Sequence, residues 1–465
     1  MVIRKTKDVS MVEGPILFKL LRFALPIMLT GILQLLFNAA DIAVVGRFAE
    51  NGKVAVGAVG ACGALINLIV NSSMGLSLGV GVAVAHDMGS GSHDRMSKVV
   101  HTAVVAASVL GIVVACVGFF FARPLLILMD TPDNVLAEAV PYMKAYFLGI
   151  PASMMYNYLA SALRSSGDTK RPLLFLAIAG LANVVFNLVM VLGFGLGAMG
   201  VGIATAISQY VALTLILIYM SRPKSPCRIR FSALGVDRSS LVRIFRLGIP
   251  ACLQSMLFSF SNVLIQSTVN SYGDTVISGH AAGSNIDGFV YTAMNSVAQG
   301  VIVFAGQNMG AGKYKRLDRV LGCGLLLVGV IGAALSCIAI ALGPVLLDFY
   351  VPGEPEVIEA GMRRLWGVCA PYLLCGIMDA CSYTLKGMGK QLIPTLIVLI
   401  GTCLMRVVWV YTVCRIFPGS PEALNNIYYL YASYPVTWSI ATVGSLIYYW
   451  HLRKRLLAGN LEIHV

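Results

Sequence analysis

Charged residues are scarce in this sequence. Asp, Glu, Lys and Arg make up 12% of the 465 residues, whereas 58% are hydrophobic. An average soluble domain carries about 25% charged residues, so this chain cannot cover a water-facing surface of its size. The scarcity excludes a cytosolic enzyme, a disordered scaffold and a fibrous protein, and it predicts an integral membrane protein.

The sequence also lacks the motifs of several chemistries. It has no Walker motif and no C-x-x-C pair, and its six His show no metal-ligand spacing. Most of the eleven Cys lie in apolar stretches, where they are expected to be packing residues. The net charge of +13 comes without a basic stripe interleaved with aromatics. We therefore expect no enzyme, no cofactor, no nucleotide or nucleic-acid partner, and no metal other than a coupling sodium ion.

Apolar runs long enough to cross a bilayer, about 20 residues each, recur along the chain. The run 173–221 is too long for one helix, and its cluster of five Gly between residues 193 and 202 predicts a turn there. Joined across single charges, the runs predict an all-α integral membrane protein with twelve transmembrane helices. These spans start near residues 17, 54, 98, 139, 172, 199, 243, 276, 319, 361, 393 and 428.

The basic residues predict the orientation. Of the 34 Lys and Arg, 26 fall in one alternate set of connecting segments and seven in the other, and Arg406 lies within a span. By the positive-inside rule, both termini of this multi-pass protein are expected in the cytoplasm, with the cell membrane as its location.

The chain repeats itself at a spacing of about 220 residues. Residues 79–91 align with residues 300–312 with six identities, and Pro26 in the first span matches Pro250 in the seventh. Since each half holds six spans, the repeat is parallel, with its axis along the membrane normal. The predicted domains are an N-lobe, a basic cytoplasmic linker and a C-lobe, at residues 1–221, 222–246 and 247–465.

Three acids fall within the predicted spans: Asp41, Asp287 and Asp379. An ionisable group at this depth is expensive, so each is a candidate functional residue. Asp41 follows Gln34 and Asn38 at a spacing of i, i+4 and i+7, which predicts one polar face on an otherwise apolar helix. A carboxylate there could exchange a proton, or hold a sodium ion with the help of amide oxygens; a purely structural role is the alternative.

Uncharged oxygens occur at similar depth later in the N-terminal half. Asn183 and Asn187 are spaced i, i+4 in the span that starts near residue 172, and Thr205 lies in the next span. Hydrogen bonding between helices is the alternative explanation for the two Asn side chains.

The C-terminal half offers two further roles for its acids. Asp287 or Asp379 could pair with Arg406 and lock the helices together, or could take part in cation coupling. Residues that could line an adaptable substrate cavity, with core packing as the alternative, are Asn262, Gln266, Met256, Met294, Tyr291 and Tyr383.

Five motifs in order along the chain resemble the MATE (multidrug and toxic compound extrusion) transporters, in particular their DinF-like branch. They are Leu25-Pro26 with Asp41 and Gly46, the turns 88–91 and 307–312, the stretch 163–172, and the segment from Asn183 to Gln209. The resemblance implies a V-shaped fold of two six-helix lobes, a central cavity, and cation-coupled efflux. In that branch an Asp, an Asn-x-x-x-Asp pair and a Thr surround the coupling cation. Asp41, Asn183 and Thr205 match this pattern, whereas Asn187 replaces the second acid.

The expected function is antiport by alternating access, in which a proton or sodium gradient drives export of amphipathic, often cationic small molecules. We expect a monomer in the lipid bilayer. The alternative is a flippase for lipid-linked saccharides on a related fold, which would need a strongly cationic cavity. The sequence offers only Arg406 in mid-span and Lys386 near the end of a span.

Overall fold

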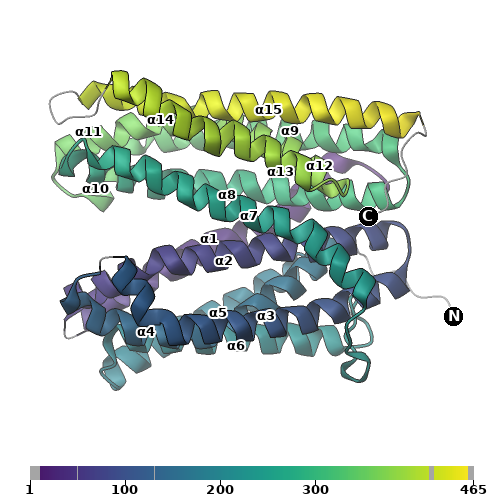
Figure 1. Cartoon of the computed structure of the whole chain (residues 1–465), viewed down its shortest axis with the longest axis horizontal. Coiled ribbons are helices and arrows are strands. Elements are labelled where there is room, and N and C mark those ends of the chain that lie inside the picture. The colour runs from purple at the N-terminus through teal and green to yellow at the C-terminus, as the bar shows by residue number, and fades with distance from the viewer. Residues whose placement is uncertain (1–10, 50, 130, 418–423, 459–465) are drawn as a thin grey trace. The chain divides into compact units, whose positions relative to one another are not determined.

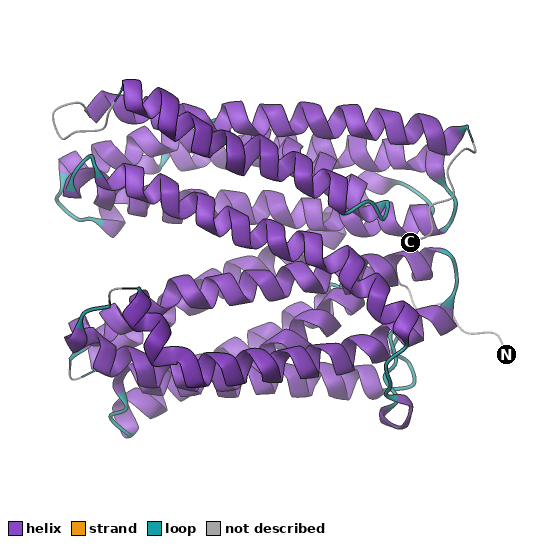
Figure 2. Cartoon of the chain, in the orientation of Figure 1, coloured by secondary structure: helices purple, strands orange, loops and turns teal. Residues whose placement is uncertain are grey.

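The computed structural model describes residues 11–49, 51–129, 131–417 and 424–458. All regular elements in these ranges are helices, as Figure 2 shows. They form two compact units. Among the described residues, unit 1 comprises residues 29–252, and unit 2 comprises residues 11–28 and 253–458.

Unit 1 contains the second part of α1 and the first part of α7 with the helices between them (Figure 1). Its elements are α1 (Ile16–Phe48), α2 (Gly52–Gly89), α3 (His93–Leu128), α4 (Asp133–Ser165), α5 (Lys170–Leu188), the π-helical turn η1 (Val189–Gly193), α6 (Gly197–Ser221), the 3-10 turn η2 (Phe231–Ala233) and α7 (Arg238–Asn270).

Unit 2 contains the start of α1, the second part of α7 and all later helices. These are α8 (Asp274–Gly310), η3 (Tyr314–Arg316), α9 (Leu317–Ala341), α10 (Gly343–Tyr350), α11 (Pro355–Arg364), the π-helical turn η4 (Leu365–Cys369), α12 (Tyr372–Gly387), α13 (Leu392–Val398), the π-helical turn η5 (Leu399–Leu404), α14 (Met405–Ile416), η6 (Leu424–Asn426) and α15 (Ile427–Leu457).

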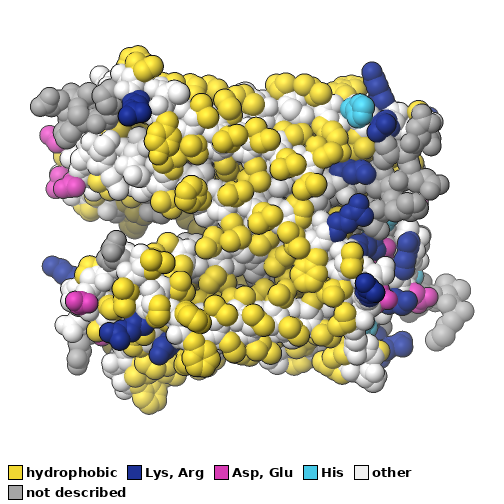
Figure 3. Space-filling view, viewed as in Figure 1, with side chains coloured by type: hydrophobic (Ala, Val, Ile, Leu, Met, Phe, Trp, Pro, Cys, Tyr) yellow, Lys and Arg dark blue, Asp and Glu magenta, His cyan; other side chains and the backbone are white. Residues whose placement is uncertain are grey.

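A helix lies at each of the twelve predicted spans. Ten helical segments in the described ranges are long and apolar enough to cross a membrane, which agrees with a multi-pass protein. The spans predicted near residues 139 and 428 correspond to α4 and α15, with 33 and 31 residues, which are not among those ten. In each unit, hydrophobic side chains cover the middle of the helices, and Lys and Arg gather at the helix ends (Figure 3).

The turns of the two halves repeat in detail. The turn after α2 has Gly91 at φ 71°, and the turn after α8 has Gly312 at φ 68°, a conformation that favours Gly. Ser92 N donates to Asp87 O at 2.9 Å, and Lys313 N donates to Asn308 O at the same distance. The predicted repeat of residues 79–91 and 300–312 therefore extends to the backbone hydrogen bonds.

The packing repeats as well. In unit 1, α4 contacts α2, α3 and α6; in unit 2, α12 contacts α8, α9 and α15. Small residues permit these close approaches: a Cβ on Gly202 of α6 would lie 2.7 Å from Tyr142 O, and one on Gly387 of α12 would lie 2.5 Å from Ile302 O. The two equivalent helices, α4 and α12, thus each form the centre around which the other helices of their unit pack.

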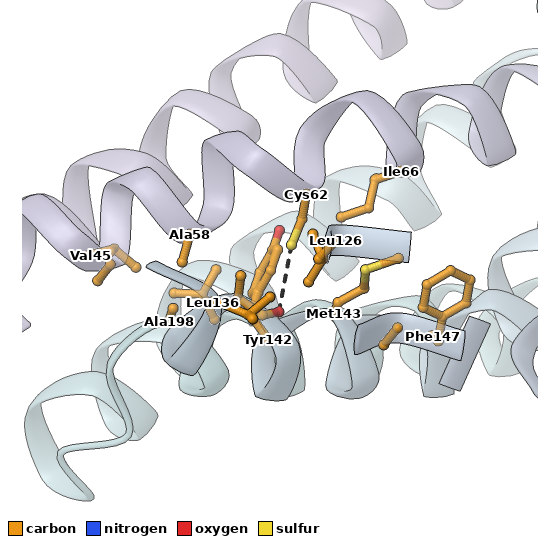
Figure 4. Close-up of a cluster of buried hydrophobic side chains, with 14 of the residues drawn as sticks. Val45, Ala58, Cys62, Ile66, Leu126, Leu136, Tyr142, Met143, Phe147 and Ala198 are labelled. Carbon is orange, nitrogen blue, oxygen red and sulfur yellow. Dashed lines mark hydrogen bonds between the residues drawn. The ribbon is translucent and has the colours of Figure 1, made fainter. Parts of the chain in front are cut away.

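An apolar cluster in unit 1 lies among the end of α1, the first half of α2, the end of α3 and much of α4 (Figure 4). Leu126, Met143 and Phe147 are almost completely buried there. Cys62 belongs to the same cluster, and its Sγ lies 3.5 Å from Ala139 O, so this cysteine serves as a small packing residue.

The basic segment after α6 lies on unit 1. Arg230 N donates to His101 Nε2 at 3.0 Å, and Asp237 N donates to Thr102 Oγ1 at 3.0 Å. Arg243 Nη1 donates to both carboxylate oxygens of Asp87 at 2.9 Å. The boundaries predicted for the N-lobe, the linker and the C-lobe stay a prediction.

Candidate functional site

Four of the six residues singled out in the N-terminal half form one chain of hydrogen bonds in unit 1. Asn187 Nδ2 donates to Asp41 Oδ1 at 2.5 Å and lies 3.2 Å from Asn183 Oδ1. Asn183 Nδ2 in turn donates to Thr205 Oγ1 at 3.3 Å. The chain joins α1, α5 and α6, and Asn183 and Asn187 are buried. We refer to these four residues as the Asp41 network.

A glycine sets the contact between α1 and α5 just before this network. A Cβ on Gly180 would lie 1.8 Å from Cε2 of Phe37, so the ring occupies the space that a side chain at residue 180 would need. Phe37 precedes Asp41 by one helical turn, and Gly180 precedes Asn187 by two. The contact of the Phe37 ring with Gly180 therefore positions the carboxylate of Asp41 beside the amide of Asn187. Sequence reasoning did not assign Phe37 or Gly180 to this site; a Gly on the same face of the span as the Asn pair was the available signal.

The other residues predicted for the polar face of α1 do not join the Asp41 network. Asn38 is exposed and Gln34 is half-buried. Neither has a hydrogen bond to any of the four residues of the Asp41 network. The physical reason is the rotation of α1 about its axis, which turns Phe37 and not Asn38 toward α5. Tyr142 and Tyr146 of α4 lie near enough to interact electrostatically with Asp41, and sequence reasoning did not single them out.

The Asp41 network includes an oxygen that could contact a bound cation. The side-chain oxygen of Asn187 is buried and has no hydrogen-bond partner among the described residues. Asp41 is paired with no base in the ranges that the structure describes. A buried acceptor beside such a carboxylate suits a cation or a proton better than it suits a closed structural network. The oxygens of Asp41, Asn183, Asn187 and Thr205 are the groups available to it.

Asp287 of α8 forms its ion pair with Arg364 and not with Arg406. Asp287 Oδ2 accepts from Arg364 Nε at 2.9 Å, and Arg364 Nη1 lies 2.8 Å from His280 Nε2. Tyr372 contacts the other carboxylate oxygen at 3.5 Å. The alternative in which Asp287 pairs with Arg406 is therefore wrong. Arg364 was counted among the basic residues outside the spans, yet it is only 5% exposed.

Arg406 has aromatic partners instead of an acid. Its guanidinium carbon lies 4.3 Å from the ring centre of Tyr434 and 6.0 Å from that of Trp438. This cation–π stacking replaces the predicted ion pair, because α14 lies beside α15, which carries both aromatic residues. No ion pair between Arg406 and Asp379 is found within the described ranges.

Asp379 and Lys386 lie on one face of α12 inside unit 2. Both are buried, and Asn295 of α8 hydrogen-bonds to Asp379. Lys386 Nζ donates to Gln254 Oε1 at 2.7 Å and lies 5.2 Å from the ring centre of Tyr383. Lys386 therefore lies in the last turn of α12, near the end of the span as predicted, but its side chain is buried within the helix bundle.

The predicted cavity residues all lie in unit 2 but have different environments. Met294 is 1% exposed, and its Sδ fills the space above Gly332 and Gly376, so it is a core residue. Tyr383 accepts from Asn295 at 3.5 Å, and Gln266 donates to Asn270 at 3.0 Å. The exposed members of the predicted set are Met256, Asn262, Gln266 and Tyr291.

An all-helical membrane protein with two repeated halves and acids buried within its helix bundles belongs to the class of secondary transporters. The MatE family model matches residues 26–189 and, a second time, residues 250–412. Together these matches cover more than half of the chain. The chain therefore belongs to the MatE family and is a transporter, not an enzyme; transporters of this family are driven by ion gradients.

Similar proteins support the same assignment. The chain is 28% identical over 440 residues to the probable multidrug resistance protein YoeA of Bacillus subtilis, which covers 93% of each chain. It is 20% identical to the multidrug export protein MepA of Staphylococcus aureus, with 97% of each covered. A solved structure of a MOP superfamily transporter from Pyrococcus furiosus has a TM-score of 0.89 at 18% identity, covering 98% of this chain and 100% of that one. This likeness confirms the predicted fold.

Proposed function

We propose that this protein is a proton-coupled multidrug exporter of the DinF-like branch, with Asp41 as the group that binds the coupling ion. The observation that carries the proposal is the Asp41 network: a carboxylate within a span, held by an amide and with no base as its partner among the described residues. The names of the relatives, a probable multidrug resistance protein and a multidrug export protein, support small amphipathic drugs as the exported substrates.

The coupling step in this proposal is a change of charge on Asp41. When the carboxylate is ionised, it accepts the hydrogen bond from Asn187, which ties α1 to α5. Binding of a proton removes the charge and weakens this bond, because hydrogen bonds to ionised groups are about twice as strong as neutral ones. An ion can shift the protein between two states only if it binds one of them more tightly. The tie between α1 and α5 supplies such a difference.

A proton fits the Asp41 network better than sodium does. One carboxylate is sufficient to bind a proton. A sodium site needs several oxygens around the ion, and Asn187 stands where the resembled pattern has a second acid. Asn187→Asp restores that acid and tests this reasoning. We expect the variant to gain dependence on sodium.

The flippase alternative has less support. It requires cations that are free to bind a pyrophosphate group, but each buried base of unit 2 has a partner in the fold. Arg364 bonds Asp287, Lys386 bonds Gln254, and Arg406 stacks on Tyr434. These contacts favour a structural role for the three bases.

The test is efflux of a cationic dye from proteoliposomes under an imposed gradient. We expect wild-type protein to export dye when a proton gradient is applied, and not when a sodium gradient is applied at equal pH. Asn187→Asp should respond to sodium as well. Export driven by sodium alone in the wild type would refute proton coupling. Failure under both gradients, with dye binding intact, would refute the proposed antiport. Both termini in the cytoplasm and a monomeric state complete the proposal.

A further inference from the structure

Two hollows flank Arg316 at the start of α9 in unit 2. The first has a volume of about 360 Å³ and lies between the beginning of α1 and α9; its lining includes Gly14, Ile16, Arg319 and Gly322. The second has a volume of about 460 Å³ and is lined by the turn after α8 and by the end of α15, at Leu456 and Leu457. Arg316 lines both, so one guanidinium is shared by two adjacent hollows.

The guanidinium of Arg316 is only partly satisfied by the protein. Its Nη2 donates to Gly14 O at 2.6 Å, but its Nε is buried and has no acceptor in the part of the chain described. Arg319 is exposed, one turn further along α9. The nearby carboxylates are occupied elsewhere: Asp318 binds Arg453 at 2.7 Å, and Glu13 lies 3.9 Å from Lys313. Among the described residues, the site therefore has positive charge without an acid paired to it.

The repeat provides an internal comparison. At the offset that aligns residues 79–91 with 300–312, Arg316 and Arg319 correspond to Arg95 and Lys98. In unit 1, Arg95 Nη2 donates to Ser92 Oγ at 2.9 Å and to Ser90 Oγ at 3.4 Å, and its Nε lies 3.8 Å from Asp87.

None of these three partners persists in unit 2. The residues that correspond to Ser90, Ser92 and Asp87 are Ala311, Lys313 and Asn308. Asn308 uses its Nδ2 to hold Met11 O and Phe304 O. The turn thus has the same backbone in both halves, but in the described ranges Arg95 is paired with an acid and Arg316 is not.

An apolar surface continues from the first hollow along α9. A Cβ on Gly322 would meet no atom within 4 Å, so the helix surface is open there. Leu326 and Val330, one and two turns further, are 55% and 60% exposed. Since residues four apart lie on the same face of a helix, this surface leads from the two arginines toward the middle of the span.

We propose that Arg316 and Arg319 bind the phosphate group of an anionic phospholipid, with an acyl chain lying over Gly322, Leu326 and Val330. Basic pockets between helix ends are suited to anionic head groups, and arginine can bind phosphate through two parallel hydrogen bonds. The acyl surface distinguishes a lipid from a free phosphate ion, which would use the arginines alone. The hollows are large enough for a head group, since small-molecule pockets typically begin at about 300 Å³.

The test is native mass spectrometry of the full-length protein with phosphatidylglycerol, phosphatidylcholine or inorganic phosphate added to neutral detergent. Wild type should retain phosphatidylglycerol in preference to phosphatidylcholine. Arg319 has no side-chain hydrogen bond within the described part of the chain, so Arg319→Gln leaves the fold intact. The double variant Arg316→Gln/Arg319→Gln should lower this preference on the order of tenfold. The matched control is Arg95→Gln/Lys98→Gln, which removes the same charges from unit 1 and should leave the preference unchanged. Dye efflux in phosphatidylcholine liposomes reports whether each variant is folded.

Gly322→Leu separates the two sources of phosphate. It keeps both arginines and fills the open surface, so it should weaken lipid retention without affecting binding of inorganic phosphate. Equal loss of preference in the unit 1 control would overturn the proposal, because the effect would then be general surface charge. Retention of inorganic phosphate by wild type with no preference among the lipids would also overturn it.

Discussion

The two halves of this transporter share their turns and their packing centre, but they treat buried charge differently. In unit 1, Asp41 bonds an amide. In unit 2, Asp287 bonds an arginine, whereas Asp379 is in no ion pair among the described residues. Protonation of a carboxylate that is paired with a base leaves that base buried without a counter-charge. A carboxylate that is bonded to amides can gain a proton without this cost. The difference between Asp41 and Asp287 supports coupling at Asp41 and a structural ion pair at Asp287–Arg364.

Breaking the ion pair of unit 2 should have the largest effect on stability. Arg364→Met leaves Asp287 buried without its base, and we expect a loss of about 3–5 kcal/mol in the free energy of unfolding. Asp287→Leu combined with Arg364→Met removes both charges and should recover much of this loss. Denaturant unfolding of the purified variants measures both effects. A double variant no more stable than Arg364→Met would contradict a structural role and would point to Asp287 in transport.

Filling the glycine of unit 1 should have the next largest effect. Gly180→Leu displaces the ring of Phe37 and separates Asp41 from Asn187, at a cost of about 1–3 kcal/mol for overpacking. Gradient-driven efflux should fall even where the variant is still folded, because the Asp41 network is disturbed. The control is Gly193→Leu, because no atom lies within 4 Å of a Cβ at that residue. Equal efflux by the two variants would contradict the positioning role of Gly180.

The second buried arginine of unit 2 should matter less than the first. Arg406→Leu removes stacking on Tyr434 but strands no acid, so we expect a loss of about 2 kcal/mol or less. The same unfolding measurement applies. A loss as large as that of Arg364→Met would show that an acid depends on Arg406 after all, and would restore the pairing predicted from the sequence.

The smallest effect is expected at Cys227, in the segment between α6 and α7. This thiol is 2% exposed, its Sγ lies 3.6 Å from Ala162 O, and burial raises its pKa to about 12. An impermeant maleimide at neutral pH should therefore not label it from either side until the protein unfolds. Exposed Lys224→Cys and Glu354→Cys are better reporters, and they should react from the inside and the outside, respectively. Labelling of both from one side would contradict the predicted orientation.

The sequence predicted much of the fold, because the lengths and spacing of the helices follow from patterns that the bilayer imposes. Apolar runs predicted the positions of the helices, and the resemblance brought Asp41, Asn183, Asn187 and Thr205 together. The repeat predicted equivalent turns, which the backbone hydrogen bonds reproduce.

Arg364 shows why the remaining features could not be predicted. It follows Arg363 at the end of an acidic stretch, and the two look equivalent in the sequence. Successive residues on a helix point about 100° apart, so only one of them can face the bundle. Arg363 bonds Glu359 at the surface, whereas Arg364 turns inward to Asp287. The side that each residue faces depends on how α11 is rotated against α8, which a single sequence does not specify.

The most direct test of the account is gradient-driven efflux by Asp41→Asn. This change keeps the size of the side chain and its capacity for hydrogen bonds, but it removes the group that changes charge. We predict that the variant binds dye as the wild type does and that a proton gradient no longer drives export, whereas the control Asp133→Asn, an exposed acid at the start of α4, exports normally. Export by Asp41→Asn at the wild-type rate would contradict coupling in unit 1.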